Sequence, residues 1–399
     1  MPCVMIIAGE SSGELYGSLL AKELIKKSDN IQLIGIGGER MKETGVELIS
    51  SISDAFGLTE ALKSLKKLKR AYNNSLSTIK TRKPDVLVLI DYPDFNLKLA
   101  KEAKKLGIKI LYYVSPQVWA WRRGRVRKIA ELVDMIAVIL PFEEKIYKDA
   151  GVRCEFVGHP VMEEIEEVSN LYFEKNQSLS FSIDAGFRNF FKTSIGARTD
   201  SQLIALLPGS RPHELEKLLP LMIDIVKKFK SDTNIFSKSK FQFCMPLAPN
   251  VDENRYSILL DELKNEGVLI SKGNSVKVLA SSDIAVVASG TATLQTALLE
   301  VPMIVVYKLS PLTFFLGKKI IRVSHISLVN ILSGNKDVVK ELLQDNANPA
   351  EVLKELKRII FDTTYKNEML NNLRKIKSLF AGKKPSERVA DIVLELAGK

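Results

Sequence analysis

The residues best suited to chemistry lie in loops that follow apolar runs of the chain. Asp91 follows one such run, 86–90, and Pro93 keeps Tyr92 out of helical geometry. This leaves Asp91 at the end of a predicted strand as a candidate general base, while Asp94 is positioned to cap the next helix. Because aspartate is common where loops begin, the local pattern also fits a turn residue without chemistry.

Two later loops have the composition of phosphate-binding turns. Their residues are Pro208, Gly209, Ser210, Arg211 and Glu214 in the first loop and Ser289, Gly290, Thr291 and Ala292 in the second. Backbone amides at such helix starts bind phosphate, and Arg211 adds a bidentate donor. Either loop alone fits simple helix capping, but the pair favours a diphosphate ligand. Neither has P-loop spacing, and no G-x-G-x-x-G follows a strand, so a P-loop nucleotidase or a Rossmann dehydrogenase is not supported.

Both tryptophans of the chain lie in one loop, directly before a run of arginines. The loop and its flank contain Ser115, Trp119, Trp121, Arg122 and Arg123. Aromatic rings beside positive charge, at the carboxyl end of a sheet, suit a ligand with apolar and anionic parts. The alternative, which the local pattern fits equally well, is that the rings pack on the core.

A glycine-rich loop follows the first apolar run, 3–8, and contains Gly9, Glu10, Ser12 and Gly13. Its glycines let a ligand come close to the main chain. A tight turn with Ser12 as the helix N-cap fits the pattern equally well.

Apolar strands alternate with helical patterns along most of the chain, which predicts parallel sheets covered by helices. The predicted strands are 3–8, 32–36, 86–90, 108–114, 135–139 and 154–157, followed by 203–207, 241–245, 284–288 and 303–307. The polar stretch between the two series reads as a linker with a short helix. We therefore predict an α/β fold with two Rossmann-like, doubly wound domains, a ligand cleft between them and a helical tail.

The predicted division follows from these patterns. It consists of a Rossmann-like domain at 1–165, a linker or insert at 166–200, a second Rossmann-like domain at 201–375 and a C-terminal helix at 376–399 that packs back across the domains.

The chain has 399 residues, a net charge of +11 and a pI near 9.3, which predicts an anionic partner. No nucleic-acid-binding signature accompanies this charge, so we expect no nucleic acid partner. The three cysteines and three histidines lack metal-ligand spacing, so we expect reduced thiols, no bound metal and no other cofactor. No signal peptide or membrane-spanning run is recognisable, which predicts a cytoplasmic protein.

A basic amphipathic helix is predicted at 56–72. Leu58, Leu62 and Leu65 recur at helical spacing, and Lys66 and Lys67 are among the basic residues on its other faces. Such a helix can lie on an anionic membrane. The alternative is an ordinary surface helix whose apolar stripe packs on its own domain.

Short motifs occur in order from the first predicted strand to the tail, at 9–13, 35–41, 91–96, 115–121, 140–143, 156–160, 207–211, 289–294, 327–332 and 341–344. Together they resemble the lipid-A-disaccharide synthase family. The resemblance implies an inverting, metal-independent glycosyltransferase of the GT-B type, bound peripherally to the inner face of the inner membrane. It would transfer 2,3-diacylglucosamine from its UDP conjugate to the 6-hydroxyl of 2,3-diacylglucosamine 1-phosphate, which forms a β-1,6 disaccharide and releases UDP.

The resemblance also implies roles for individual residues. Asp91 would be the catalytic base, and Arg211 would stabilise the departing diphosphate. Gln295 and Asn330 would meet the nucleotide together with the two phosphate-binding loops. The acceptor would meet the first glycine loop, the tryptophan loop, Asp94 and Asn96.

Four features depart from the family pattern. They are Gln295 in place of a glutamate, Glu14 and Tyr16 in place of aspartate and histidine, Val329 in place of proline, and a longer stretch at 167–199. None of them removes Asp91 or Arg211, so we expect an active enzyme. The alternatives are a non-catalytic paralogue that binds UDP or lipid, and another GT-B enzyme such as a UDP-sugar epimerase. The sequence leaves the oligomeric state open.

Overall fold

The computed structural model describes residues 1–9, 11–51, 61–119, 124–176, 183–233, 240–309 and 324–398, without the side chains of residues 11, 61–65, 175 and 176. The chain forms two compact units. The first contains Met1–Pro160 and Gly382–Lys399, and the second contains Val161–Ala381.

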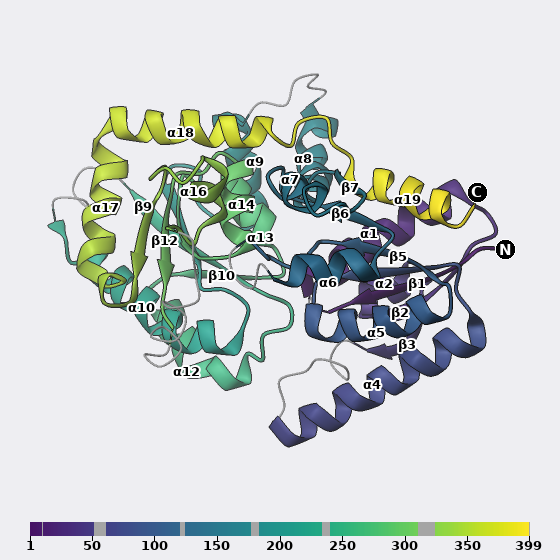
Figure 1. The fold of residues 1–399 in the computed structure, drawn as a ribbon. Coiled ribbons are helices and arrows are strands. Elements are labelled where there is room, and N and C mark those ends of the chain that lie inside the picture. The colour runs from purple at the N-terminus through teal and green to yellow at the C-terminus, as the bar shows by residue number, and fades with distance from the viewer. Residues whose placement is uncertain are drawn as a thin grey trace. The chain divides into compact units, whose positions relative to one another are not determined.

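The first unit is built on a parallel sheet of seven strands in the order β3-β2-β1-β4-β5-β6-β7 (Figure 1). The strands are β1 (Cys3–Ala8), β2 (Gln32–Gly37), β3 (Glu47–Ser51), β4 (Val86–Ile90), β5 (Lys109–Tyr113), β6 (Met135–Val138) and β7 (Cys154–Phe156). The helices are α1 (Ser11–Lys27), α2 (Glu39–Glu43), α4 (Ala61–Arg82), α5 (Pro93–Lys105), α6 (Arg125–Leu132), α7 (Glu143–Lys148) and α19 (Pro385–Leu396). The strand order reverses between β1 and β4, which is where open parallel sheets bind ligands.

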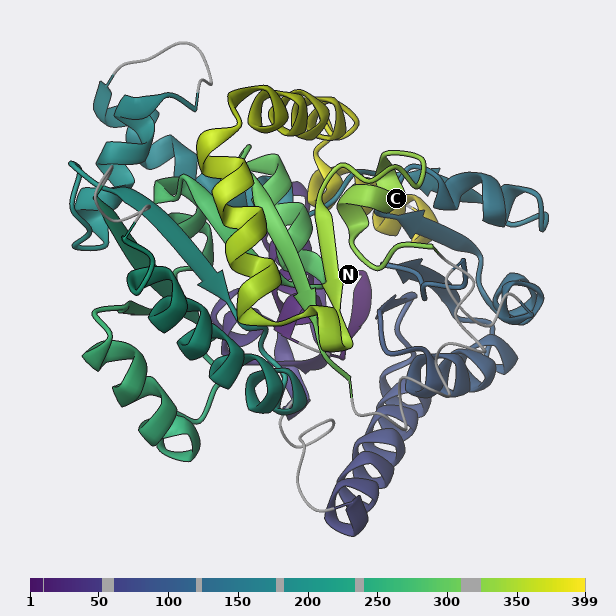
Figure 2. The same ribbon diagram turned by 90° about the vertical axis from the view of Figure 1, so that its left-hand side faces the viewer.

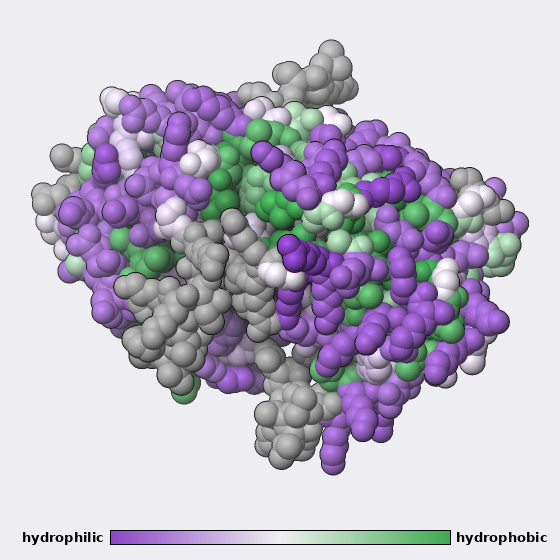
Figure 3. Space-filling model, viewed as in Figure 1, coloured by the Kyte–Doolittle hydropathy of each residue, from purple (hydrophilic) through white to green (hydrophobic). Residues whose placement is uncertain are grey.

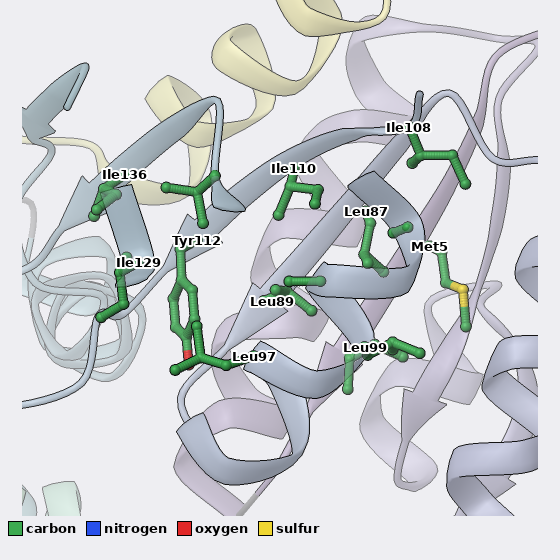
Figure 4. Packing of buried hydrophobic residues seen from close by; sticks show 14 of the residues in the cluster. Met5, Leu87, Leu89, Leu97, Leu99, Ile108, Ile110, Tyr112, Ile129 and Ile136 are labelled. Atoms are coloured by element: carbon green, nitrogen blue, oxygen red, sulfur yellow. The ribbon is translucent and has the colours of Figure 1, made fainter. Parts of the chain in front are cut away.

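The core of the first unit forms because its strands are apolar on both faces. On one face, Met5, Leu87 and Leu89 pack with Leu99 of α5 and Ile129 of α6, all fully buried (Figure 4). Helix α4 lies on this same face through side chains from Leu68 onward, including Ala71 and Ile79.

The last helix, α19, returns the chain to the first unit and packs beside α1. Asp391 forms an ion pair with Lys27 at 2.8 Å. Arg388 binds Glu155 through two hydrogen bonds of 2.8 and 2.9 Å, which ties α19 to β7. The tail predicted at 376–399 therefore contains the end of α18, in the second unit, and the whole of α19.

The second unit has a parallel sheet of six strands in the order β10-β9-β8-β11-β12-β13. The strands are β8 (Gln202–Leu207), β9 (Phe241–Leu247), β10 (Leu269–Lys272), β11 (Ile284–Ala288), β12 (Met303–Tyr307) and β13 (Lys340–Leu343). The helices are α8 (Val161–Asn176), α9 (Ala185–Ser194), α10 (Pro212–Lys230), α12 (Ser257–Asn265), α13 (Ser275–Ser281), α14 (Thr291–Leu298), α16 (Leu328–Leu332), α17 (Pro349–Phe361) and α18 (Thr363–Ser378), with 3₁₀ turns at Asn254–Tyr256 and Gln344–Asn346. Helix α17 packs on α10 and on β12 and β13, as Figure 2 shows.

Helices α8 and α9 occupy most of the stretch predicted as a linker or insert, and they belong to the second unit. Arg188 of α9 is bound by backbone carbonyls, including those of Ser282 and Glu300. Lys192 is buried and donates to Asp283 at 2.9 Å. These cations anchor α9 to the ends of α13 and α14, a tertiary role that a polar sequence pattern does not reveal.

The two predicted parallel sheets are confirmed, and the predicted strands match observed ones to within two residues at either end. The prediction omits β3, β10 and β13. All three are edge strands with largely half-buried side chains, so they lack the continuous apolar run that marks a central parallel strand.

Candidate active site

The switch point of the first unit brings together the loops that follow β1 and β4. Ala8 pairs with Ile90, so the loops that begin at Gly9 and Asp91 start side by side. A Cβ atom on Gly9 would lie 2.4 Å from the Cβ of Tyr92. Only glycine fits at this position, because the neighbouring loop comes so close.

Asp91 stands at the end of β4 with its main chain held in place. Its φ of +52° and the +41° of Tyr92 are left-handed values that are strained for these residue types. The amide of Asp91 donates to the carbonyl of Val114 at 3.2 Å, and its carbonyl accepts from Asn96 Nδ2 at 2.6 Å and from the Tyr112 hydroxyl at 2.8 Å. Asn96 is fully buried, so it acts on the site through Asp91. These bonds fix the direction in which a half-buried carboxylate leaves the strand, as a general base requires.

The prediction that Asp94 caps the following helix is wrong. Helix α5 begins at Pro93, with Tyr92 as its N-cap and no capping hydrogen bond from that side chain. Proline at the first helical position places Asp94 inside the first turn, two residues past the N-cap. Its exposed carboxylate instead forms an ion pair with Arg125 at 2.5 Å.

Two glycine-loop residues lie in the first turns of α1. The helix already begins at residue 11, so Ser12 lies inside its first turn and not at its N-cap. A Cβ on Gly13 would lie 3.4 Å from Ile90 Cγ2, so this turn packs closely on the end of β4. Glu10 lies outside the described residues.

Glu14 and Tyr16, which depart from the family pattern, both have contacts inside the first unit. The Glu14 carboxylate accepts from the Arg40 amide at 3.0 Å at the start of α2. Tyr16 packs edge to face on His159 with ring centroids 5.9 Å apart. Burial lowers the pKa of His159 to about 3, so its ring is neutral.

Trp119 packs inside the first unit. Its buried ring meets Phe142 edge to face at 5.2 Å, and its Nε1 donates to Glu143 Oε1 at 3.1 Å. The buried Ser115 hydroxyl donates to the same oxygen at 3.5 Å. The packing interpretation is therefore correct for this ring. The remaining predicted residues of this loop, Trp121, Arg122 and Arg123, lie outside the described residues.

In the second unit, the two predicted phosphate loops meet at the switch point between β8 and β11. These strands pair in register, Leu207 with Val287, so both loops leave the same edge of the sheet. The placement agrees with a ligand site at the carboxyl ends of the strands.

The first of these loops is held by Glu214, a residue of the helix that follows it. Glu214 Oε2 accepts from the amides of Ser210 at 3.1 Å and Arg211 at 3.2 Å, so a carboxylate already holds the amides expected to bind phosphate. Gly209 has a φ of +94°, and a Cβ there would lie 2.2 Å from Glu214 Oε2. Pro208 leads into this turn from β8. The Arg211 side chain, half-exposed, remains the group that can reach a ligand.

The second loop leaves its helix start open among the described residues. The N-cap of α14 is Gly290, which makes no side-chain capping bond, and a Cβ there would meet no atom within 4 Å. Ser289 turns away and donates to the carbonyl of Ile326 at 2.9 Å. The amides of Thr291 and Ala292 are the first two of the helix, and amides at these positions have no acceptor within their own helix.

Gln295 and Asn330, the two other residues predicted to meet a nucleotide, differ in their surroundings. Gln295 is half-buried, and its Nε2 donates to Glu164 Oε2 at 2.9 Å. Asn330 is fully buried. Its Nδ2 donates to the Val339 carbonyl and to Glu341, and its Oδ1 accepts from the amides of Val338 and Val339. These bonds use the full capacity of an asparagine side chain, so here Asn330 supports the fold.

The predicted site residues omit two buried or half-buried carboxylates that shape these loops. Glu143 holds the Trp119 loop, and burial raises its pKa to about 8. Glu341 accepts from the amides of Ile326 and Ser327 at 2.9 and 3.0 Å, and so fixes the segment that binds Ser289. Both lie in motifs that carry the family resemblance, which was the available signal.

Within the described ranges, no helix is long and apolar enough to cross a membrane. Those same ranges contain no group of three or more histidine, cysteine or acidic side chains that could hold a metal ion.

The two sheets define a GT-B-type fold. Similar solved structures include the UDP-GlcNAc 2-epimerase from Neisseria meningitidis bound to UDP-GlcNAc, with a TM-score of 0.65, 12% identity and coverage of 99% of this chain and 100% of that one. Another is the S. aureus MnaA–UDP co-structure, with a TM-score of 0.64, 11% identity and coverage of 100% and 98%. At these identities the likeness concerns the fold alone.

Sequence relatives identify the family within this fold. A family model described as lipid-A-disaccharide synthetase matches residues 4–393. The lipid-A-disaccharide synthase of Syntrophus aciditrophicus is 39% identical, over 99% of this chain and 98% of its own. That of Geobacter sulfurreducens is 38% identical, over 99% and 97%. The chain belongs to the lipid-A-disaccharide synthetase family and is a glycosyltransferase.

Proposed function

We propose that this enzyme joins UDP-2,3-diacylglucosamine to 2,3-diacylglucosamine 1-phosphate, giving the β-1,6-linked disaccharide 1-phosphate and UDP. The observation that carries the proposal is Asp91. Its carboxylate leaves the end of β4, at a switch point, from a main chain held by three hydrogen bonds. A fixed, half-buried carboxylate at such a position suits a base for a sugar hydroxyl.

The reaction requires one proton transfer and one displacement. Asp91 takes the proton of the acceptor's 6-hydroxyl while that oxygen attacks the anomeric carbon of the donor from the face opposite UDP. The bond to the diphosphate breaks and the configuration inverts. Residues of the first glycine loop (Gly9, Glu10, Ser12 and Gly13), with Ser115, Trp121, Arg122 and Arg123, are proposed to shape the acceptor side.

The second unit is proposed to hold UDP. The open amides at the start of α14 and the guanidinium of Arg211 are groups that stabilise a diphosphate as its negative charge grows. Gln295 lies in the same helix, where it is proposed to meet the ribose. The same groups would serve a paralogue that binds UDP without catalysis, so activity has to be tested at Asp91.

We also propose peripheral binding to an anionic membrane through residues 56–72. In α4, Ala71, Ser75 and Ile79 are buried against the first unit, while Lys66 is exposed. From Leu68 onward the helix therefore uses its apolar stripe for packing. Leu58 and the side chains of Leu62 and Leu65 lie outside the described residues. Polar residues dominate the face seen in Figure 3, with apolar ones in smaller patches, and the net charge of +11 favours an anionic surface.

The test of function is UDP release from both lipid substrates by the wild type, Asp91→Ala and Asp91→Asn. Loss of the base is expected to lower kcat by about 10²- to 10⁴-fold, with both variants still binding UDP. Asp149→Asn, an exposed carboxylate of the same unit, is the control and should keep the wild-type rate. No UDP release by the wild type, or an unchanged rate in Asp91→Ala, overturns the proposal.

The test of membrane binding replaces Leu58, Leu62 and Leu65 by Ser and measures sedimentation with anionic vesicles. The variant should lose vesicle binding, and unchanged binding would show that this helix is not the docking element.

A further inference from the structure

The contact between Gln295 and Glu164 joins two helices of the second unit. Gln295 Nε2, on α14, donates to Glu164 Oε2, on α8, at 2.9 Å. The helices pack against each other, and both side chains are half-buried. A charged acceptor makes such a bond stronger than a bond between two neutral groups.

The pair lies beside the open helix start. Gln295 is four residues beyond Thr291 and three beyond Ala292, so the three share one face of α14. All three are half-buried, whereas Thr293, Leu294 and Thr296 are buried. Helical side chains lean towards the N-terminus, so Gln295 lies on a face that leads to the helix end where the amides of the first turn are open.

The hydrogen bond fixes which way round the amide sits. A carboxylate only accepts, so Glu164 selects the orientation in which Nε2 faces it. The planar amide then presents Oε1, an acceptor, on its other arm. A ribose carries two neighbouring hydroxyls, and each is a donor that such an acceptor can bind.

We propose that Glu164 is a positioning residue that orients Gln295 to accept a hydrogen bond from the ribose diol of the uridine nucleotide. The proposal rests on the UDP site of the proposed function and adds a specificity role for α8. It also explains why position 295 holds an amide. A carboxylate at position 295 would lie within hydrogen-bonding distance of the Glu164 carboxylate, and the repulsion between the two charges would destabilise their contact.

The experiment compares affinities for UDP and 2′-deoxy-UDP by calorimetry on the full chain, for wild type, E164Q, Q295E and the swapped double variant E164Q/Q295E. The wild type should prefer UDP by about tenfold, the size of one hydrogen bond. In E164Q an amide faces an amide, either orientation forms a bond, and the preference should fall towards one. Q295E should lose affinity for both nucleotides. The double variant restores one carboxylate and one amide, with the acceptor at 295, and should recover the preference.

A role confined to folding would not change the ratio between two nucleotides. Melting temperatures check that each variant folds, and Glu167→Gln, an exposed site on the same helix, is the matched control. In turnover assays E164Q should raise KM for the UDP-sugar and leave kcat within about twofold, because Gln295 binds ground and transition states alike.

An unchanged UDP preference in E164Q, or a double variant no better than Q295E, overturns the inference. So does a wild type that fails to bind UDP. If the preference behaves as expected but no variant or wild type transfers sugar, the inference stands and the proposed transferase activity fails, so the two failures can be told apart.

Discussion

Two loops of the second unit look alike in sequence and differ in what holds their backbone amides. In the loop before α10, the backbone amides of Ser210 and Arg211 donate to Glu214 Oε2 at 3.1 and 3.2 Å. The loop before α14 has no such carboxylate among the described residues, and open space surrounds Gly290. Both follow neighbouring strands at one switch point.

In the proposed UDP site, this difference would give the two loops different parts in holding the diphosphate. At α10 a carboxylate of the protein itself binds the amides of Ser210 and Arg211, so this loop can offer a ligand its exposed side chains, of which Arg211 is the cation. At α14 the amides and the helix dipole are available. The α10 loop would thus offer the guanidinium of Arg211 on a turn held by Glu214, and the α14 loop would offer open backbone amides.

Among variants of these two loops, the largest effect is expected at Arg211. Arg211→Ala removes the cation of the α10 loop, and should lower kcat by about 10²- to 10³-fold. Arg211→Lys keeps the charge without the bidentate fork and should recover part of the loss. The measurement is UDP release at saturating substrates, with Arg255→Ala, an exposed arginine ion-paired to Glu216, as control. A rate within threefold of wild type in Arg211→Ala would refute the division.

The next largest effect is expected when either loop glycine is replaced by alanine. Both have positive φ, +94° at Gly209 and +153° at Gly290, so alanine strains either backbone by about 1–2 kcal/mol. Gly209→Ala also displaces Glu214 and should mainly lower the melting temperature. Gly290→Ala meets no neighbouring atom but covers the open amides, and should mainly raise KM for the UDP-sugar, by about tenfold. Equal effects of the two variants on both quantities would remove the distinction.

A smaller effect, on stability alone, is expected from Glu214→Gln. The amide keeps the shape but turns a charged acceptor into a neutral one, and should reduce the free energy of unfolding by about 1–2 kcal/mol. Urea denaturation measures this change. Glu216→Gln, an exposed neighbour on α10, should change it by less than about 0.5 kcal/mol. A gain in UDP affinity without loss of stability would show that Glu214 competes with the ligand more than it supports the loop.

The sequence predicted the sheets and the loops well, but not this difference between loops. Central strands such as Val86–Ile90 and Ile284–Ala288 were predicted to the residue because burial on both faces requires a continuous apolar run. Turn composition likewise located Asp91 and both helix starts. Whether an amide is open or already bound depends on a side chain one turn away, and Glu214 looks like any first-turn acid in a sequence.

Two tertiary arrangements were equally hidden. Asn330 is engaged by residues 338–341, and Gln295 by Glu164, 131 positions away in the chain. Neither spacing has a local signature. The resemblance to the family did mark these segments as informative, without telling whether each residue faces a ligand or the fold.

The first unit contains a carboxylate comparable to Glu214, and it offers the subtlest test. Glu143, at the start of α7, accepts from the Leu140 amide at 3.2 Å and from Trp119 Nε1 at 3.1 Å. Glu214 has the guanidinium of Arg211 at 3.9 Å, whereas Glu143 has neutral donors and is fully enclosed, so burial raises its pKa from 4.5 to about 8. The stability of the Glu143 loop should therefore depend on pH.

Between pH 4.5 and 8 the folded protein holds a proton on Glu143 that the unfolded chain has released. Stability contributed by this group is therefore greatest below pH 4.5 and decreases as pH rises to 8, by at most about 1.4 kcal/mol per pH unit. Glu143→Gln cannot titrate, so the difference in unfolding free energy between wild type and variant should change in the variant's favour from pH 5 to pH 8. The buried His159 has the opposite effect, because it lowers the unfolding free energy as pH falls from 6.5 to 3. This contribution is the same in wild type and variant, so it cancels in the difference. If the two stability curves run parallel across this range, Glu143 is ionised in the fold, and a charged acceptor holds its loop.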